Sequence, residues 1–329
     1  MKRRTAQVSL VVVAVCVLVA GCGGDSDSTT TVGTPSPERS TASTGTRPVD
    51  DILVQRYDVA QGPDWMAVDD RGLWVMRDLG STLLIDPASG SIVSEVDTGK
   101  YELPLCQGIG AGYGVVYLCR GTDLLRIDEA TLKVVDRVKL HKEYAQGHIP
   151  AAFGRFWVLE GDGSTLTGLD PATGRVVSRF ALPARGWDLA AGPDALWVAC
   201  KIDGQVLKID PDTGEVLITA EMPNPEYVTV ADQVWVAGSS QTYQVDKDSG
   251  AVLATFDVGA EPVGDLVSDD RYVWVRNADD FLVQIAQSTG GVVRYVSDLT
   301  VGGSLGVAGG DLWLAADDES TLMRLRPDP

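Results

Sequence analysis

The sequence predicts an all-β fold, a seven-bladed β-propeller of four-stranded antiparallel blades. An apolar strand around an aromatic residue recurs seven times, with spacings of 43, 40, 40, 38, 39 and 39 residues. The seven aromatic anchors are Trp74, Tyr117, Trp157, Trp197, Trp235, Trp274 and Trp313. This period is the length of one propeller blade. Six anchors are also followed by a second strand and a tight turn, as in IDPASGSIV from Ile85 onward, and such turns join antiparallel strands.

The N-terminus is expected to place the chain on the extracytoplasmic face of a cell membrane. Residues 1–21 begin with basic residues and continue with an apolar run too short to span a bilayer comfortably. They lead into LVAGC, which resembles a bacterial lipobox, so Cys22 would be lipidated and become the mature N-terminus. The alternative is an ordinary cleaved signal peptide, with Cys22 as an incidental thiol.

Residues 22–50 are predicted to be a disordered tether, because they are rich in Ser and Thr and nearly devoid of apolar side chains. A flexible chain of this length reaches on the order of 30 Å. The propeller domain, residues 51–329, can therefore stand clear of the lipid headgroups.

The register of the repeats predicts how the ring closes. In the unit around Trp197, residues 187–190, 196–199, 205–209 and 215–220 read as the inner, second, third and outermost strands. After Trp313 only a third strand, residues 321–325, remains before the chain ends, whereas residues 52–60 precede the first inner strand. We therefore expect the N-terminal strand to complete the last blade, which removes unpaired end faces.

The net charge restricts the partners of the chain. The formal charge is −19, and loss of residues 1–21 removes three positive charges and moves it to −22. An acidic body is repelled by nucleic acids and by anionic lipid surfaces. No nucleic-acid partner is expected, and contact with the membrane is expected through the lipid alone.

The LWV-type strands and the D-P-x-T/S-G-x-V turns resemble bacterial seven-bladed propellers of the YVTN, NHL-like and quinoprotein-like repeat groups. The resemblance covers residues 51–329. It implies the fold and leaves the activity open, since such propellers include lyases, redox enzymes and binding modules. The anchor aromatics are expected to pack between neighbouring blades and not to stack on a cofactor.

Two cysteines are predicted to form a disulfide. Cys106 and Cys119 lie symmetrically about residues 112–113, so the two ends of one hairpin would place them opposite each other in an oxidising compartment. The alternative is two buried thiols. Cys200 has no partner in this scheme and is expected to be a buried, unreactive thiol.

Blade alignment predicts a set of residues that could line one pocket at the ring's axis. One group lies eight to ten positions before the anchors and comprises Trp65, Gln107, His148, Trp187 and Tyr227. Another lies three positions after them and includes Arg77, Arg120, Glu160 and Asn277. The alternative is that these are separate loop residues with ordinary packing or solvent contacts.

No metal site or cofactor is expected. Acidic loops occur at residues 160–162, 279–280 and 317–319, but none has the spacing of a calcium loop, and a solvated acidic rim is the expected reading. The sequence lacks G-x-S-x-G, H-E-x-x-H, Walker and dinucleotide-binding motifs.

The predicted function is a ligand- or protein-binding scaffold, lipid-anchored and extracytoplasmic. The alternative is an enzyme. Streptogramin-lyase-like propellers use a His and carboxylates on the later blades, where this chain has no His, and quinone-dependent enzymes of similar repeats usually have adjacent cysteines and eight blades. In a lyase-type enzyme His148 would act as general base and Glu160 would orient a metal or substrate. Carboxylates within hydrogen-bond reach of His148 would favour the enzyme.

Overall fold

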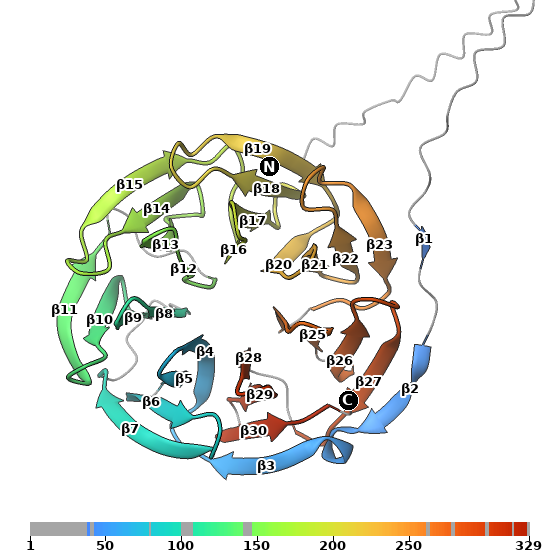
Figure 1. Ribbon diagram of the computed structural model, residues 1–329, viewed down its shortest axis with the longest axis horizontal. Coiled ribbons are helices and arrows are strands. Elements are labelled where there is room, and N and C mark those ends of the chain that lie inside the picture. Colours follow the sequence, from blue (N-terminus) through green and yellow to red (C-terminus); the bar gives the residue numbers. More distant parts are fainter. Residues whose placement is uncertain are drawn as a thin grey trace, which may run out of the picture. The chain divides into compact units, whose positions relative to one another are not determined.

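The computed structural model describes residues 38–39, 43–78, 80–99, 108–140, 147–260, 264–277, 280–299, 303–317 and 319–327, all within one compact unit, Pro37–Pro329. Seven sheets stand side by side around a central axis (Figure 1), as the sequence predicts. Within the described part of the chain, no helix is both long and apolar enough to cross a membrane.

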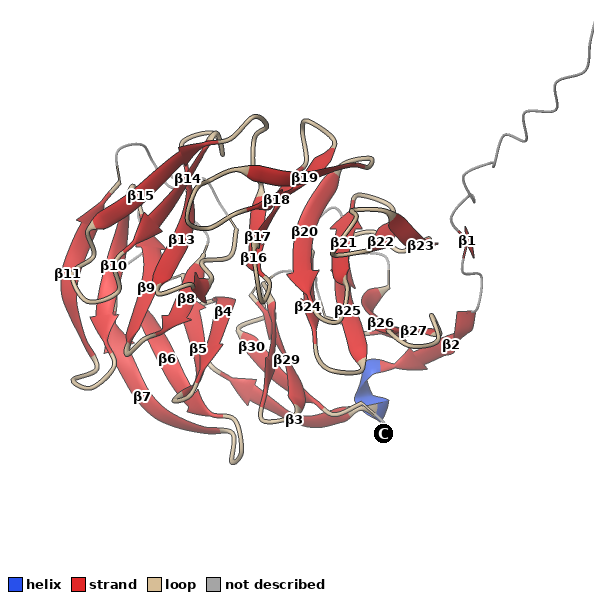
Figure 2. Ribbon diagram, turned by 45° about the horizontal axis from the view of Figure 1, so that its top comes forward, coloured by secondary structure: helices blue, strands red, loops and turns tan. Residues whose placement is uncertain are grey.

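Each blade is a meander of four antiparallel strands that runs from the axis to the periphery (Figure 2). From blade 1 to blade 7, the inner strands are β4 (Pro63–Asp69), β8 (Ile109–Gly112), β12 (Ala151–Ala152), β16 (Asp188–Ala191), β20 (Pro225–Val230), β24 (Asp265–Ser268) and β28 (Leu305–Ala308). The second strands are β5 (Gly72–Arg77), β9 (Val115–Arg120), β13 (Arg155–Glu160), β17 (Leu196–Cys200), β21 (Val234–Gly238), β25 (Tyr272–Asn277) and β29 (Asp311–Ala316). The third strands are β6 (Ser81–Asp86), β10 (Asp123–Asp128), β14 (Thr165–Leu169), β18 (Gln205–Ile209), β22 (Thr242–Val245), β26 (Phe281–Ala286) and β30 (Thr321–Leu325). The outer strands are β7 (Ser91–Asp97), β11 (Lys133–Lys139), β15 (Val176–Ala181), β19 (Val216–Glu221), β23 (Val252–Phe256), β27 (Val292–Val296) and β3 (Leu53–Asp58).

The ring closes as predicted, because β3 from the N-terminal part of the chain completes blade 7. It pairs antiparallel with β30, from Leu53 opposite Leu325 to Asp58 opposite Thr321. Tyr57 of β3 stacks on Trp313 with ring centroids 5.6 Å apart, so side-chain packing reinforces the ladder.

The anchor aromatics fill the blades. All seven lie on second strands and are at most 1% exposed. Several stack on an aromatic residue of the outer strand in the same blade, as Trp157 does on Phe180 at 6.1 Å and Trp235 on Phe256 at 5.5 Å. No anchor is therefore free to stack on a cofactor.

The turns between third and outer strands follow from their sequence. In blade 3, Asp170 Oδ1 accepts hydrogen bonds from the backbone N–H and the hydroxyl of Thr173, at 2.8 and 2.6 Å. These bonds, with that of the hydroxyl the largest, hold the pKa of Asp170 below its usual range. Gly174 has φ +68°, a conformation that favours glycine, and its N–H donates to the carbonyl of Asp170.

The N-terminal segment contributes more structure than the sequence predicts. Residues 43–48, assigned above to the tether, form β2 (Ser43–Pro48), which pairs parallel with β27. A shorter strand, β1 (Glu38–Arg39), pairs parallel with β23, and the 3-10 turn η1 (Val49–Asp51) joins β2 to β3. A Ser/Thr-rich segment can pair in this way because strand addition uses backbone groups and needs no apolar side chain.

The predicted pairing of Cys106 with Cys119 stays a prediction, because Cys106 lies outside the described residues, as does the predicted lipidation site Cys22. Cys119 is fully buried on β9. Cys200 is a free, fully buried thiol on β17, as expected, and burial raises its pKa to about 12. This thiol is therefore protonated at neutral pH.

Candidate functional site at the propeller axis

One residue from each blade lies directly before a buried apolar residue that lines the cavity at the axis, and we call these seven residues the axial ring. They are Trp65, Gly108, His148, Asp188, Tyr227, Asp265 and Ser304. The inner strands surround the axis, so the ring brings together groups from blades that are not neighbours. Trp65 of blade 1 packs edge-on against the imidazole of His148, which precedes blade 3, with ring centroids 5.0 Å apart.

His148 forms the centre of the ring. Its backbone N–H donates to Asp188 Oδ1 at 2.9 Å, and its ring Nδ1 lies 2.9 Å from the same oxygen. Its Nε2 lies 3.6 Å from Oδ1 of Asp265, across the axis in blade 6. One carboxylate, that of Asp188, therefore lies within hydrogen-bond reach of His148, as the enzyme alternative requires, and that of Asp265 lies just beyond it.

Those carboxylates also tie neighbouring blades together. Asp188 Oδ2 accepts the backbone N–H of Val228 at 3.0 Å, and Asp265 Oδ2 accepts that of Leu305 at 2.7 Å. Ser304 repeats the arrangement, because its hydroxyl oxygen accepts the N–H of Met66 at 2.9 Å. In each case a side chain of the ring bonds the inner strand of the next blade, and both carboxylates are at most 1% exposed. The ring is thus a set of clasps between blades.

The charges in the ring decide its protonation state. Burial of the imidazole lowers the pKa of His148, but the charges of Asp188 and Asp265 outweigh burial and raise it to about 9. Burial raises the pKa of Asp265, an effect that His148 partly offsets. Arg276, which pairs with Asp265 across β24 and β25, is fully buried, and burial lowers its pKa to about 10. At neutral pH, His148 and Arg276 are therefore cations beside buried carboxyl groups.

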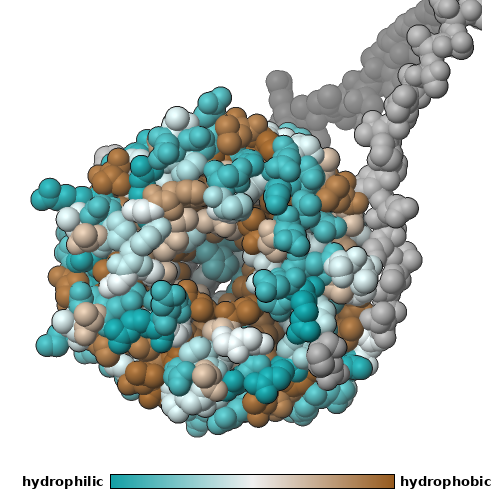
Figure 3. Space-filling model, in the orientation of Figure 1, coloured by the Kyte–Doolittle hydropathy of each residue, from teal (hydrophilic) through white to brown (hydrophobic). Residues whose placement is uncertain are grey.

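A cavity of about 390 Å³ adjoins the ring along the inner strands. The space-filling view is hollowed at the axis (Figure 3). Of the ring residues, His148 alone reaches the cavity wall, which is otherwise made of small and apolar residues with Thr229 and Ser268, whose hydroxyls are 3.0 Å apart. Among the described residues, no Trp or Cys lines this cavity. Among the described residues, no group of three or more His, Cys, Asp and Glu gathers in a way that could hold a metal ion.

A second cavity, of about 260 Å³, lies between blades 3 and 4, and we call it the Trp187 pocket. It is lined by Gly161, Asp162, Arg185, Gly186, Trp187, Lys201 and Ile202. Lys201 Nζ lies 5.0 Å from the centroid of the Trp187 ring and pairs with Glu226 at 3.0 Å. The indole N–H of Trp187 is buried and has no hydrogen-bond partner among the described residues, and Ile202 is 62% exposed.

The structure divides the sequence-predicted pocket residues. Trp65, His148 and Tyr227 meet in the axial ring, where burial raises the pKa of Tyr227. Trp187 lies in its own pocket. Gln107 lies outside the described residues.

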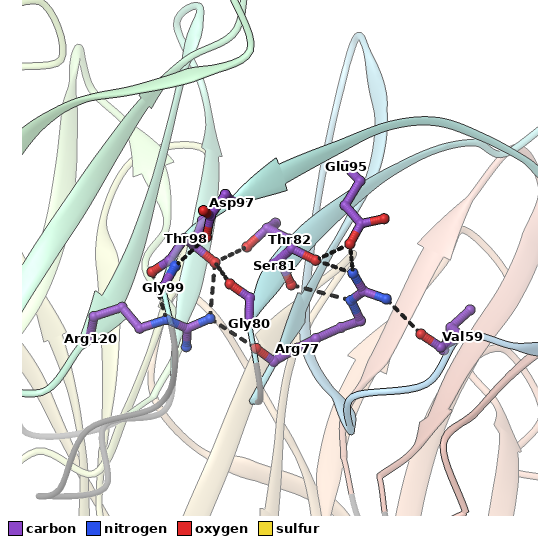
Figure 4. Close-up of polar contacts among 10 residues, drawn as sticks. All are labelled: Val59, Arg77, Gly80, Ser81, Thr82, Glu95, Asp97, Thr98, Gly99 and Arg120. Atoms are coloured by element: carbon purple, nitrogen blue, oxygen red, sulfur yellow. Dashed lines mark hydrogen bonds and ion pairs between the residues drawn. The ribbon is translucent and has the colours of Figure 1, made fainter.

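The residues three positions after the anchors do not reach the axis. Arg77 donates to Ser81, to Glu95 and to the carbonyl of Val59, and Arg120 donates to the carbonyl of Arg77 at 2.8 Å (Figure 4). Both arginines are buried and connect blades 7, 1 and 2.

Glu160 and Asn277 are also structural in their contacts. Glu160 is 1% exposed and accepts hydrogen bonds from Thr167 and Arg179, so it does not belong to a solvated acidic rim. Asn277 donates to the carbonyl of Gly259 at 2.9 Å and accepts the N–H of Asp280 at 2.7 Å. Both residues end second strands. Glu160 bonds the third and outer strands of its blade, and Asn277 bonds two loops, so both side chains hold the structure in place.

Sequence reasoning missed Asp188, Asp265 and Ser304. The available signal was a constant offset: Trp65, His148, Asp188, Asp265 and Ser304 each lie nine positions before their anchor. Tyr227 lies eight positions before its anchor because the hairpin of blade 5 is one residue shorter, with Thr229 opposite Trp235. A range of eight to ten positions before the anchors, as used in the sequence prediction, is too wide to reveal the constant offset of nine.

Comparison with known proteins supports the fold. Residues 162–242 match a family model described as "Outer membrane protein assembly factor BamB". The chain is similar in fold to BamB from Moraxella catarrhalis, with a TM-score of 0.60 and 16% sequence identity over 84% of this chain and 99% of that one. No curated protein matches the chain in sequence. The resemblance to quinoprotein-like repeat propellers is thus confirmed for the fold.

Proposed function

We propose that this protein is a lipid-anchored, extracytoplasmic binding or scaffolding module that holds another protein on the face containing the Trp187 pocket. The observation that carries the proposal is the contrast between the two cavities. The polar groups of the axial ring are bonded to the propeller itself, whereas the Trp187 pocket leaves apolar surface exposed between two cations. Apolar surface rimmed by polar residues is typical of protein interaction sites.

The similarity to BamB agrees with this reading. The family model that matches residues 162–242 describes an outer membrane protein assembly factor, and this segment includes Trp187, Lys201 and Ile202. At 16% identity the likeness shows the fold alone, so the partner of this chain is inferred from the pocket and not from the name.

The chemistry of the pocket indicates the kind of partner. Trp187 and Ile202 favour an apolar side chain, and the indole N–H requires a hydrogen-bond acceptor once it is covered. Arg185 and Lys201 add donors at the rim. A loop of an extracytoplasmic protein that presents an apolar residue next to a backbone carbonyl or carboxylate fits these features.

The enzyme alternative has one observation in its favour, the convergence of Asp188 and Asp265 on His148. A general base must be neutral to accept a proton, and a pKa of about 9 keeps His148 protonated at neutral pH. Glu160 is buried in another network and cannot orient a substrate at this site. A His148 pKa below 7, measured by NMR titration, would restore the general-base role.

Membrane anchorage is tested by Cys22→Ala. We expect the variant to leave the membrane pellet on fractionation, because anchoring depends on acyl chains. Retention of Cys22→Ala in the pellet after a salt wash would show that another part of the chain holds it there.

The binding function is tested by cross-linking in intact cells. The tagged, full-length protein is expected to capture a defined protein whose recovery falls with Ile202→Asp and not with Val177→Asp. Both residues are exposed, at 62% and 55%, but Val177 lies on the outer strand of blade 3, away from the pocket. Equal recovery with the two variants would place the binding surface elsewhere, and turnover of a small molecule that needs His148 would establish the enzyme.

A further inference from the structure

The outer strands of the blades differ in regularity. Six of the seven, all of which lie in the described part of the chain, contain a one-residue bulge near their start. The extra residues are Val54 in β3, Val93 in β7, Val135 in β11, Val177 in β15, Leu217 in β19 and Leu253 in β23, and all are 43–55% exposed. Bulges twist an edge strand and disfavour pairing with another strand. At six outer edges the bulge therefore disfavours the addition of a long strand.

Blade 6 is the exception. Its outer strand β27 pairs with β26 in one unbroken register, from Leu282 opposite Tyr295 to Ile285 opposite Val292. The same strand carries β2 along its outer side, from Ser43 opposite Val292 to Pro48 opposite Val296, with one register shift between Ser43 and Gly45 (Figures 1 and 2). By comparison, β1 covers only two residues of β23, beyond the bulge at Leu253. The outer strand without a bulge, β27, is therefore also the one that accepts a long added strand.

Backbone pairing with β27 holds the docked strand. Gly45, Thr46, Arg47 and Pro48 are all exposed, so β2 buries no apolar side chain there. The chain becomes anchored only at η1 and just after it, where Val49 and Ile52 are 2% and 3% exposed in the core cluster that includes Tyr295. Residues up to Pro48 can thus leave β27 while the following segment stays in place.

The composition of β2 makes it a weak occupant. Its sequence, STGTRP, contains Gly and Pro, which are depleted in strands, whereas β-branched and aromatic residues pair best. Val296 at the end of β27 stays 43% exposed although Pro48 lies opposite it. A segment with a β-branched residue in place of Pro48 would pair more favourably, whereas the position of Gly45, with φ +134°, favours glycine.

We propose that the outer edge of β27 is a strand-addition site, at which an extended, β-branched segment of another extracytoplasmic protein replaces β2 in the same parallel register. In this arrangement β2 occupies the edge until the partner arrives and prevents uncontrolled edge-to-edge association. The site rests on the proposed binding function and is separate from the Trp187 pocket, so either can fail without the other.

The test uses the full-length protein and a fluorescent hexapeptide with the β2 sequence, except for Val at the position of Pro48. Gly45→Pro opens the protein's own edge, since Gly45 has φ +134°, which proline cannot adopt. The peptide is expected to bind Gly45→Pro at least tenfold more tightly than wild type and to slow amide hydrogen exchange in β27 but not in β15. The same peptide with Pro at its third residue serves as the control and is expected not to bind.

Equal affinity for wild type and Gly45→Pro, no binding to either, or protection of β15 in place of β27 would overturn the proposal. A dimer of Gly45→Pro that protects β27 would assign the edge to a second copy and would also overturn it. Hydrogen exchange of the unmodified protein gives an independent check, because β27 amides should exchange faster than those of β26 without global unfolding. Co-exchange of β2, β26 and β27 would show that β2 is a fixed part of the blade.

Discussion

Trp187 and Asp188 are neighbours in the sequence, yet they belong to two different sites. Asp188 is fully buried in the axial ring and bonds His148 and Val228. Trp187 lines a pocket with exposed apolar surface. Trp187 lies in the bend before β16 and Asp188 is the first residue of that strand, so the start of the strand separates a structural clasp from a surface available to a partner. The comparison shows that buried charge at a propeller axis is not by itself evidence of catalysis.

The largest expected effect comes from removing the clasp. Asp188→Ala leaves a part-buried imidazolium and the buried N–H of Val228 without their partner, which is expected to cost about 3–5 kcal/mol of unfolding free energy. The measurement is urea denaturation at pH 7. Asp203→Ala is the matched control at the Trp187 pocket, where Asp203 forms a part-exposed ion pair with Arg185 at 3.5 Å. The control is expected to cost about 1 kcal/mol or less, and equal losses would remove the distinction between the two regions.

The next effect is a pH dependence confined to the ring. The pKa of His148 is raised in the folded state from 6.5 to about 9, so its stabilising contribution is complete below pH 6.5 and is lost as the pH rises through 9. A shift of this size corresponds to at most about 3 kcal/mol. Unfolding free energies measured from pH 6 to 9.5 should fall more steeply for wild type than for His148→Gln. Parallel curves would mean that His148 is neutral or that its charge is not stabilised by the carboxylates.

The smallest effect on stability is expected at the pocket. Ile202→Asp changes an exposed side chain and should alter the unfolding free energy by less than about 0.5 kcal/mol. Its expected consequence is loss of the bound protein. A large fall in melting temperature for this variant would instead mean that Ile202 packs within the propeller and that the pocket is not accessible to a partner.

The fold was predictable because every blade repeats the same signals. The buried anchors, such as Trp157, and the turns, such as that of Asp170 and Gly174, recur from blade to blade. The closing strand, residues 52–60, follows from the register of these repeats. The strand β2 was not predictable, because its composition is that of a linker and its pairing depends on the regularity of β27, far away in the sequence.

The site was predictable only in part. Offsets from the anchors bring Trp65, His148 and Tyr227 to the axis, but an error of one residue exchanges Asp188 for Trp187. The partners of Arg77 and Glu160 could not be read from the sequence either, since they are set by third and outer strands whose register depends on bulges.

Cross-linking recovery of the partner protein, compared between His148→Gln and Ile202→Asp in intact cells, tests the central claim most directly. The account predicts that His148→Gln lowers the melting temperature and keeps the cross-linked partner, whereas Ile202→Asp keeps the melting temperature and loses the partner. The opposite pattern, loss of the partner with His148→Gln and retention with Ile202→Asp, would place the function at the axis and contradict the account.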